Sequence, residues 1–225
     1  MLSYRSFVGV VAGALCLTTL SSADGAIIHL AGGTITDLTE SSVTDPVPLY
    51  GDPFVAGNSM SFSTGPFAAA QAGVGSDITS GQLSFVVQAD PGLFIESIHL
   101  DEIGDFLMLG STAEVTAGGT LVATILDPFV GGFVSDPIDI TPNVPLTGTG
   151  SGLWSGEAWL DLSNYQATRI RVDLDNILIA SSDAPSHAAF IDKKALNVSI
   201  AFTQIPEPAA IALMSMGLAV LIRRQ

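Results

Sequence analysis

The chain contains 225 residues and has a formal net charge of −15 at pH 7, from 22 acidic and seven basic residues. Residues 24–205 hold 21 of the acidic residues but only four basic ones, which gives this stretch a formal charge of −17. Such a charge repels phosphate backbones, so the composition excludes nucleic-acid binding. The one cysteine, Cys16, lies in the N-terminal apolar run, so we expect neither a disulfide bond nor thiol chemistry in the mature protein.

Residues 1–23 have the pattern of a secretory signal peptide. Arg5 precedes an apolar run at residues 7–20, and Ser21 and Ala23 place small residues at the −3 and −1 positions of a cleavage site. A permanent membrane anchor, the alternative, needs closer to about 20 apolar residues. We therefore expect export through the inner membrane and a mature ectodomain that begins at residue 24.

The central part of the chain alternates apolar and polar residues with a period of two and shows almost no helical periodicity. The clearest example is the segment 169–175, in which Ile170, Val172 and Leu174 alternate with charged side chains. One face of this strand must therefore be exposed to solvent. Strands are predicted at residues 82–88, 94–100, 119–126, 157–162, 169–175 and 196–202.

Turn residues separate these strands, for example Asp90-Pro91-Gly92 and Asp136-Pro137. Because strands and turns alternate in this way, we expect one all-β ectodomain at residues 24–204, a jelly-roll-like β-sandwich of about eight strands. Residues 52–76 are rich in Gly, Ala and Ser, and we expect them to form a long loop or a ragged edge.

The C-terminal segment, residues 205–225, combines a rigid motif, an apolar stretch and a basic end. Pro206, Glu207 and Pro208 are followed by the apolar residues 209–222 and then by Arg223 and Arg224. A helix of this length covers roughly 21 Å, less than a hydrocarbon core of about 30 Å, so it suits transient insertion into the inner membrane. The paired arginines favour the cytoplasmic side, which places the ectodomain outside.

This arrangement resembles the PEP-CTERM sorting signal of bacteria that make exopolysaccharide and possess an exosortase. The resemblance implies that an exosortase recognises the tail and cuts it near the motif. The ectodomain would then be released or attached at the outer surface. Ala209 stands where many members have serine or threonine, so the cleavage position is not specified.

Motifs for catalysis are missing from the sequence. His29, His99 and His187 lie far apart, and neither an HExxH nor a GxSxG motif is present. Four glutamates, Glu96, Glu102, Glu114 and Glu157, are eligible for glycoside hydrolysis, but alternation favours solvent faces for most acids. We therefore predict a non-catalytic protein without catalytic residues or a bound cofactor.

One aromatic residue is a candidate for carbohydrate binding. Trp159 is expected to share the outward face of its strand with Glu157 and Asp161, and Trp154 and Tyr165 could extend an aromatic platform for sugar rings. Packing of Trp159 against a neighbouring loop is the alternative.

Two acidic clusters are candidates for a calcium site. Asp101, Glu102 and Asp105 form one cluster, and Asp173 and Asp175, with Asn176 beside them, form the other. Their oxygen atoms are the hard ligands that calcium prefers, although neither cluster has the spacing of an EF-hand loop. Solvated acidic faces are the alternative.

The sequence as a whole predicts an exported, exosortase-sorted surface or extracellular-matrix protein, associated with exopolysaccharide or biofilm. A carbohydrate-binding module is the second hypothesis, and an extracellular hydrolase is the third. The predicted partners are the exosortase and exopolysaccharide.

Overall fold

The computed structural model describes residues 27–128 and 131–205, and all regular secondary structure in this part of the chain is β. None of these residues belongs to a helix long and apolar enough to cross a membrane. The predicted signal peptide, the Pro206–Pro208 motif and the apolar segment 209–222 lie outside the described residues. The all-β prediction is therefore confirmed for the part of the ectodomain that the structure describes.

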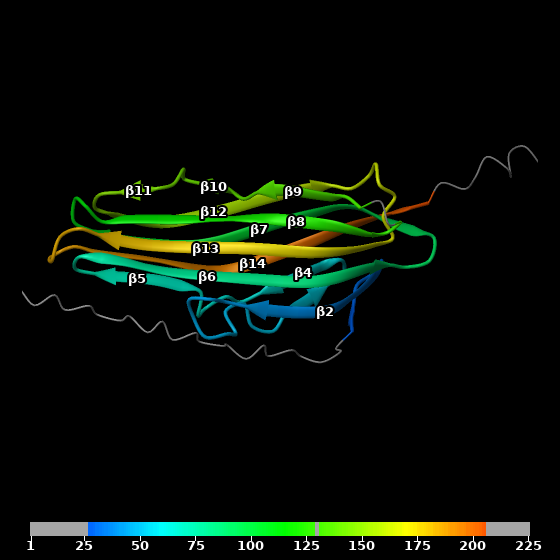
Figure 1. The fold of residues 1–225 in the computed structure, drawn as a ribbon, viewed down its shortest axis with the longest axis horizontal. Helices are drawn as coiled ribbons and strands as arrows, with labels where there is room; N and C mark the ends of the chain where they lie inside the picture. Colours follow the sequence, from blue (N-terminus) through cyan, green and yellow to red (C-terminus); the bar gives the residue numbers. More distant parts are fainter. Residues whose placement is uncertain (1–26, 129–130, 206–225) are drawn as a thin grey trace, which may run out of the picture.

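The strands form two antiparallel sheets, which Figure 1 shows one behind the other with the strands along the long axis. Sheet A has, in spatial order, β1 (Ile28–His29), β2 (Gly33–Ser41), β6 (Gly75–Ala89), β13 (Arg169–Ser182), β8 (Glu114–Asp127) and β11 (Leu146–Thr147), with β9 (Phe133–Pro137) also paired to β8. Sheet B has β10 (Asp139–Thr141), β12 (Gly150–Asp161), β7 (Leu93–Leu109), β14 (Ala188–Gln204), β4 (Ser59–Phe62) and β3 (Phe54–Ala56), with β5 (Ala68–Ala72) also paired to β14.

Period-two alternation places the apolar side chains between the two sheets. In β13, Ile170, Val172 and Leu174 are buried, while Arg169 and Arg171 on the other face are exposed. All six predicted strands form, and β7 and β14 extend to 17 residues each. The predicted turn between β6 and β7 also forms, and it is closed by a hydrogen bond from the Leu93 amide to the Asp90 carbonyl (3.0 Å).

Two local expectations differ from the structure. Residues 52–76 contain the short strands β3, β4 and β5 at the edge of sheet B, because Met60 and Phe62 alternate with serines and point into the core. Asp136 and Pro137 do not form a turn but end β9, in which Pro137 pairs with Thr120. Proline is tolerated there because β9 is an edge strand and needs no amide donor on its free side.

A β-bulge in β14 decides which of its side chains face the core. Lys193 pairs with Gly104 of β7 and Ala195 pairs with Ile103, so Lys194 is the additional residue. Before the bulge Lys193 points inward, and after it Leu196 does. The bulge therefore shifts the alternation by one residue and places a lysine between the sheets.

A buried polar cluster, which consists of Tyr50, Glu102, Asn176 and Lys193, joins the two sheets. Lys193 forms an ion pair with Glu102 inside sheet B, and Glu102 accepts a hydrogen bond from Nδ2 of Asn176 in sheet A (3.2 Å). The Tyr50 hydroxyl donates to Oδ1 of Asn176 (2.9 Å). Each polar group in the cluster has a partner, which is the condition for burying such groups at acceptable cost.

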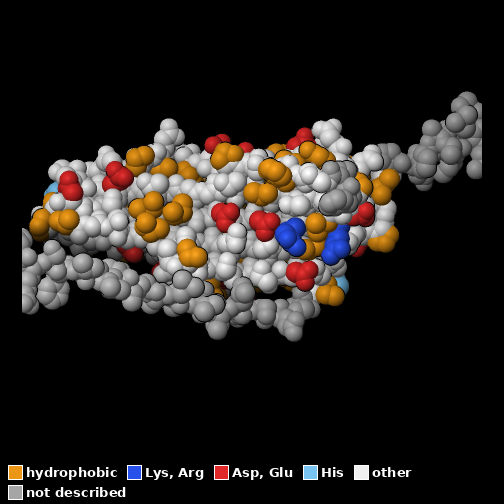
Figure 2. Space-filling model, in the orientation of Figure 1, with side chains coloured by type: hydrophobic (Ala, Val, Ile, Leu, Met, Phe, Trp, Pro, Cys, Tyr) orange, Lys and Arg blue, Asp and Glu red, His pale blue; other side chains and the backbone are white. Residues whose placement is uncertain are grey.

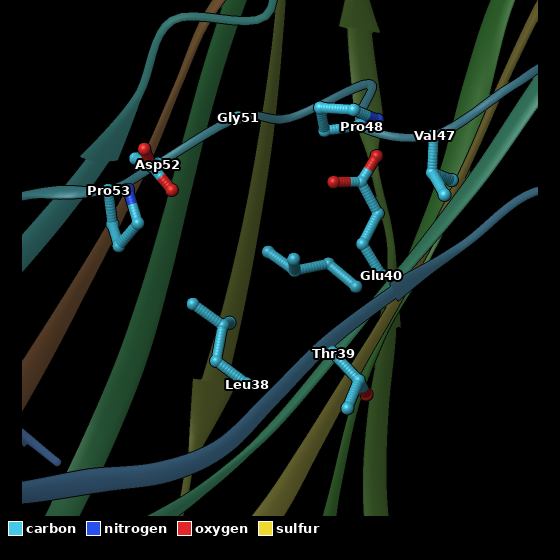
Figure 3. A pocket seen from close by; sticks show the side chains of 9 residues that line it. Leu38, Thr39, Glu40, Val47, Pro48, Gly51, Asp52 and Pro53 are labelled. Carbon is cyan, nitrogen blue, oxygen red and sulfur yellow. The ribbon is translucent and has the colours of Figure 1, made fainter. Parts of the chain in front are cut away.

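Tyr50 reaches the cluster from a loop that Glu40 of β2 holds in place. The Glu40 carboxylate accepts hydrogen bonds from the backbone amides of Leu49 and Tyr50, and Figure 3 shows it pointing toward this loop. The pocket between β2 and the loop, at about 280 Å³, lies just below the roughly 300–1,000 Å³ of ordinary ligand sites. The pocket is therefore best explained as the space under an anchored loop.

Gly104 of β7 provides a test of this packing. A Cβ atom at Gly104 would collide with the Asp192 carbonyl and with the indole of Trp154, whereas one at Gly118 of β8 would touch only Ile177 at 3.7 Å. We predict that Gly104→Ala lowers the free energy of unfolding by about 1–3 kcal/mol through overpacking. Gly118→Ala, the control, should stay within about 1 kcal/mol of wild type. Urea denaturation of both variants measures the difference, and equal midpoints would contradict the packing.

Candidate functional site

The outer face of sheet B, which points away from the core, exposes several large apolar side chains. Six of them lie on this face: Phe54, Ile103, Leu107, Leu109, Leu153 and Trp159. They are spread along the face: Ile103 and Leu153 line one hollow, and Trp159 lies near the other end of β12. Polar groups that could orient a ligand lie beside Trp159.

Trp159 lies at one end of this face, held between two neighbouring strands. Its side chain is 55% exposed, and it is the register partner of His99 in β7. The two rings lie 5.4 Å apart between centroids and are tilted by 52°. The Trp159 amide donates to Oδ2 of Asp136 (2.9 Å), which ties β12 to β9 of the other sheet. The backbone of Trp159 is thus tied to β9, while its exposed indole lies against the ring of His99.

A row of hydroxyl and amide groups continues from His99 across the sheet. Ser199 of β14 is the register partner of His99, and Ser59 of β4 follows it with a hydroxyl contact of 2.9 Å to Ser199. In the parallel row, Ser61 donates to Oδ1 of Asn197 (2.9 Å). These partly buried hydrogen bonds hold the polar groups in one orientation beside the aromatic pair.

Carboxylates continue the row of Ser61 and Asn197 across the sheet, because Asn197 is the register partner of Asp101. Asp101 of β7 pairs in register with Glu157 of β12, and Glu157 pairs in register with Asp139 of β10. Asp101 also lies 3.3 Å from Nδ1 of His99. Hydrogen bonds from Ser163 lower the pKa of Asp161, at the end of β12 beyond Trp159. This end of the face therefore offers carboxylate oxygens as acceptors and repels anionic ligands.

The far end of the face is more apolar. Ile103 and Leu153 line a hollow there, next to Lys194, whose Nζ contacts Asp192 (2.5 Å) and Asp105 (3.3 Å). Burial raises the pKa of Asp192, and the hydrogen bond from Lys194 opposes that shift. From Leu153 to Trp159 the face runs for roughly 20 Å along β12.

The first acidic cluster predicted to bind calcium is divided by the strand itself. Asp101 and Asp105 point outward from β7, whereas Glu102 points into the core, where it is 2% exposed and paired with Lys193. Successive side chains of a strand point to opposite faces, so adjacent acids cannot converge on one ion. In the described part of the chain, no three His, Cys, Asp or Glu side chains are placed to hold a metal ion.

The second cluster is divided in the same way. Asp173 and Asp175 lie on the outer face of sheet A, where they accept hydrogen bonds from Ser84 (2.6 Å) and Gln82 (3.0 Å). Asn176 points into the core. Figure 2 views the molecule from the side of sheet A and shows acidic and basic side chains close together on this surface. Neither set of residues forms the predicted calcium cluster.

The predicted aromatic platform is smaller than expected. Trp159 points outward with Glu157 and Asp161, as predicted, but Trp154 is 2% exposed and donates its indole N–H to the Asp192 carbonyl (2.9 Å). Tyr165 packs against the core. His99 takes the place of these residues beside Trp159. No local pattern in the sequence predicts this neighbour, because β7 and β12 meet only through tertiary pairing.

No protein-family model matches the sequence, and no curated protein matches it. Among solved structures, the chain is similar to TmCBM61 in complex with beta-1,4-galactotriose, at 11% identity and a TM-score of 0.26, over 75% of this chain and 88% of that one. It is also similar to the winged bean acidic lectin complexed with methyl-alpha-D-galactose, at 10% identity and a TM-score of 0.25, over 82% of this chain and 96% of the lectin.

A third similar structure is the enzymatically active domain of bacteriophage CBA120 tailspike protein 4, at 14% identity and a TM-score of 0.22. The match covers 83% of this chain and 19% of the tailspike chain. TM-scores of this size support no functional conclusion, so the function of this protein is inferred from the geometry of the sheet B face alone.

Fluorescence quenching tests the environments of the two tryptophans, which are the only ones in the sequence. We predict that iodide quenches a large part of the wild-type emission, because Trp159 is half exposed and Trp154 is buried. In Trp159→Phe, the remaining emission should be shifted to shorter wavelength and resist iodide. Circular dichroism serves as the folding control. Strong quenching of Trp159→Phe would show that Trp154, not Trp159, faces the solvent.

Proposed function

We propose that this protein is an exported surface or extracellular-matrix protein whose ectodomain binds carbohydrate, without catalysis, through the outer face of sheet B. The observation that carries the proposal is the exposed indole of Trp159, which lies against the ring of His99 on β7. An exposed aromatic ring stacks on the apolar face of a pyranose, and an indole loses little conformational freedom on binding because it has only two rotatable side-chain bonds.

The polar rows beside Trp159 supply the second element that a sugar site needs. Binding sites for small polar ligands combine an apolar surface with a few fixed donors and acceptors that set orientation. Asn197 and Ser199 offer both donors and acceptors, and Asp101 offers an acceptor for sugar hydroxyl groups. Their hydrogen bonds to neighbouring strands keep them in place before a ligand arrives.

The charge of the face specifies the kind of sugar. Asp101, Glu157 and Asp139 stand in one row next to Trp159, in an ectodomain with a formal charge of −17. Uronates and sulfated sugars would be repelled by these carboxylates. The proposed ligand is therefore a neutral polysaccharide.

Export and sorting belong to the same proposal and are supported by the two ends of the sequence. Residues 1–23 have the signal-peptide pattern, and Pro206, Glu207, Pro208, Arg223 and Arg224 form the sorting pattern that an exosortase would process. A polysaccharide-binding domain delivered to the outer surface would meet its ligand there.

Substitution of Trp159 tests the binding function. We predict that Trp159→Ala lowers the affinity for neutral polysaccharide at least about tenfold, equivalent to about 1.4 kcal/mol, because the stacking surface is lost. Affinity gel electrophoresis in soluble β-glucan and galactan, with alginate as the anionic control, measures this affinity. Phe133→Ala removes another exposed aromatic side chain, on sheet A, and should bind like wild type.

Three outcomes would refute the carbohydrate proposal: equal retardation of Trp159→Ala and wild type, stronger binding to alginate than to the neutral polymers, or no retardation of wild type in any neutral polymer. Shortening of the polymer during incubation, measured by size-exclusion chromatography, would instead support the hydrolase hypothesis.

The sorting part of the proposal is tested separately in the native host. We expect the intact mass of the mature protein to lack residues 1–23 and a C-terminal segment that includes residues 209–225, because both are targeting segments. Deletion of the exosortase gene should leave a longer, membrane-associated form. A mature protein that still contains residues 209–225 would rule out processing.

A further inference from the structure

The buried polar cluster brings an amine and a carboxamide from different strands onto one carboxylate. Glu102 of β7 forms the ion pair with Lys193 of β14 through Oε2, and the same oxygen accepts from Nδ2 of Asn176 in β13 at 3.2 Å. Lys193 is 0% exposed, Glu102 is 2% exposed and Asn176 is 4% exposed. Two groups that donate to one oxygen atom lie within a few ångströms of each other, and here water is excluded from both.

The surroundings of the lysine are apolar and aromatic. Its Nζ lies 4.9 Å from the ring centroid of Phe67 and 5.9 Å from that of Tyr50. Burial lowers the pKa of Lys193, although the nearby Glu102 opposes this shift. In an apolar site a charged pair is costly, so transfer of a proton from the ammonium to the carboxylate produces a neutral amine and a carboxylic acid more readily than in water. A neutral amine is a nucleophile.

The carboxamide of Asn176 is polarised from its other side. The Tyr50 hydroxyl lies 2.9 Å from Oδ1 of Asn176 and 3.1 Å from the Gly81 carbonyl, so its single proton is shared between these two acceptors, and burial raises the pKa of Tyr50, which keeps the hydroxyl protonated. A fixed donor at this oxygen stabilises the negative charge that would develop when a nucleophile attacks the carbonyl carbon. Asn176 thus has a donor on its oxygen and an acceptor, Glu102, on its nitrogen.

Glycines make room for this arrangement. A Cβ atom at Gly119 would meet Nδ2 of Asn176 at 2.8 Å, and one at Gly156 would meet Oε1 of Glu102 at 2.9 Å. Both glycines lie in strands adjacent to the residues they accommodate, at positions where a side chain would push the reacting groups apart. The site is therefore built into the backbone of both sheets.

We propose that Lys193 and Asn176 react with each other to form an intramolecular amide cross-link, with Glu102 moving the protons. Glu102 takes a proton from the Lys193 ammonium, and the neutral Nζ attacks Cγ of Asn176. The bond between Cγ and Nδ2 then breaks as Glu102 delivers this proton to the departing nitrogen, which leaves as ammonia, and the regenerated Glu102 carboxylate takes the second proton that Nζ loses when it becomes an amide N–H. No oxidant, reductant or further reactant is needed.

The cross-link has a structural consequence that suits an exported protein. It joins β13 of sheet A to β14 of sheet B, so the two halves of the sandwich become one covalent unit. Residues 24–205 contain no cysteine, so no disulfide can provide this link. An amide bond also resists reducing conditions, and it limits the conformations of the unfolded chain as a disulfide does. This inference is independent of the proposed carbohydrate binding.

Mass spectrometry of the denatured purified protein tests the cross-link. The intact mass should be lower than the sequence mass by one ammonia molecule. Trypsin should fail to cleave after Lys193 and should release a peptide of residues 172–194 with the same deficit. Asp-N then cleaves this peptide before Asp173, Asp175, Asp183 and Asp192, and the fragments 175–182 and 192–194 should stay joined only if Asn176 and Lys193 are linked. Separation of these two fragments, or an intact mass without the deficit, would overturn the proposal.

Variants separate the roles of the residues in this reaction. Lys193→Arg and Glu102→Gln should both show the full sequence mass, the first for lack of the nucleophile and the second for lack of the proton carrier. Lys194→Arg, which changes the exposed neighbouring lysine, should keep the deficit of one ammonia. A deficit that persists in Lys193→Arg would identify another reaction of Asn176, such as a cyclic imide. A deficit that persists in Glu102→Gln would exclude Glu102 as the proton carrier.

Discussion

The burial of Lys193 beside Glu102 is the constraint on which much of this fold depends. An isolated charge between two sheets is too costly to keep, so the lysine requires Glu102 and Glu102 requires Asn176 as a second donor. The requirement extends to the backbone. A bulge in β14 turns Lys193 inward, and glycine at position 156 leaves space for the Glu102 side chain.

The same constraint explains why the loop before β3 is anchored so firmly. Tyr50 completes the cluster only when its hydroxyl reaches Asn176, and Glu40 fixes the loop by accepting two backbone amides. The cluster therefore contains residues from both sheets and from the loop between β2 and β3. Such a network specifies a single arrangement of the sheets, because any slip in register would leave a buried polar group without its partner.

The outer face of sheet B depends on this interior without contacting it. Because the strands alternate, fixing Glu102 inward also fixes Asp101 outward, and Asp101 aligns with Glu157 and Asn197 on the neighbouring strands. The aromatic pair of Trp159 and His99 stands one row further along. A rigid interior thus holds an exposed face in a fixed geometry, which is what a site for an extended polar ligand needs.

The sequence alone determined the β class, the six principal strands and the outward position of Trp159, because alternation with period two is a local property of the chain. It could not show that neighbouring acids such as Asp101 and Glu102 would serve opposite faces of one strand. Nor could it show that Lys193 contacts Glu102, 91 residues away, or that Asn176 contacts Glu102, 74 residues away. Only the tertiary structure determines these contacts, because strand order, register and the bulge in β14 depend on how the whole core packs.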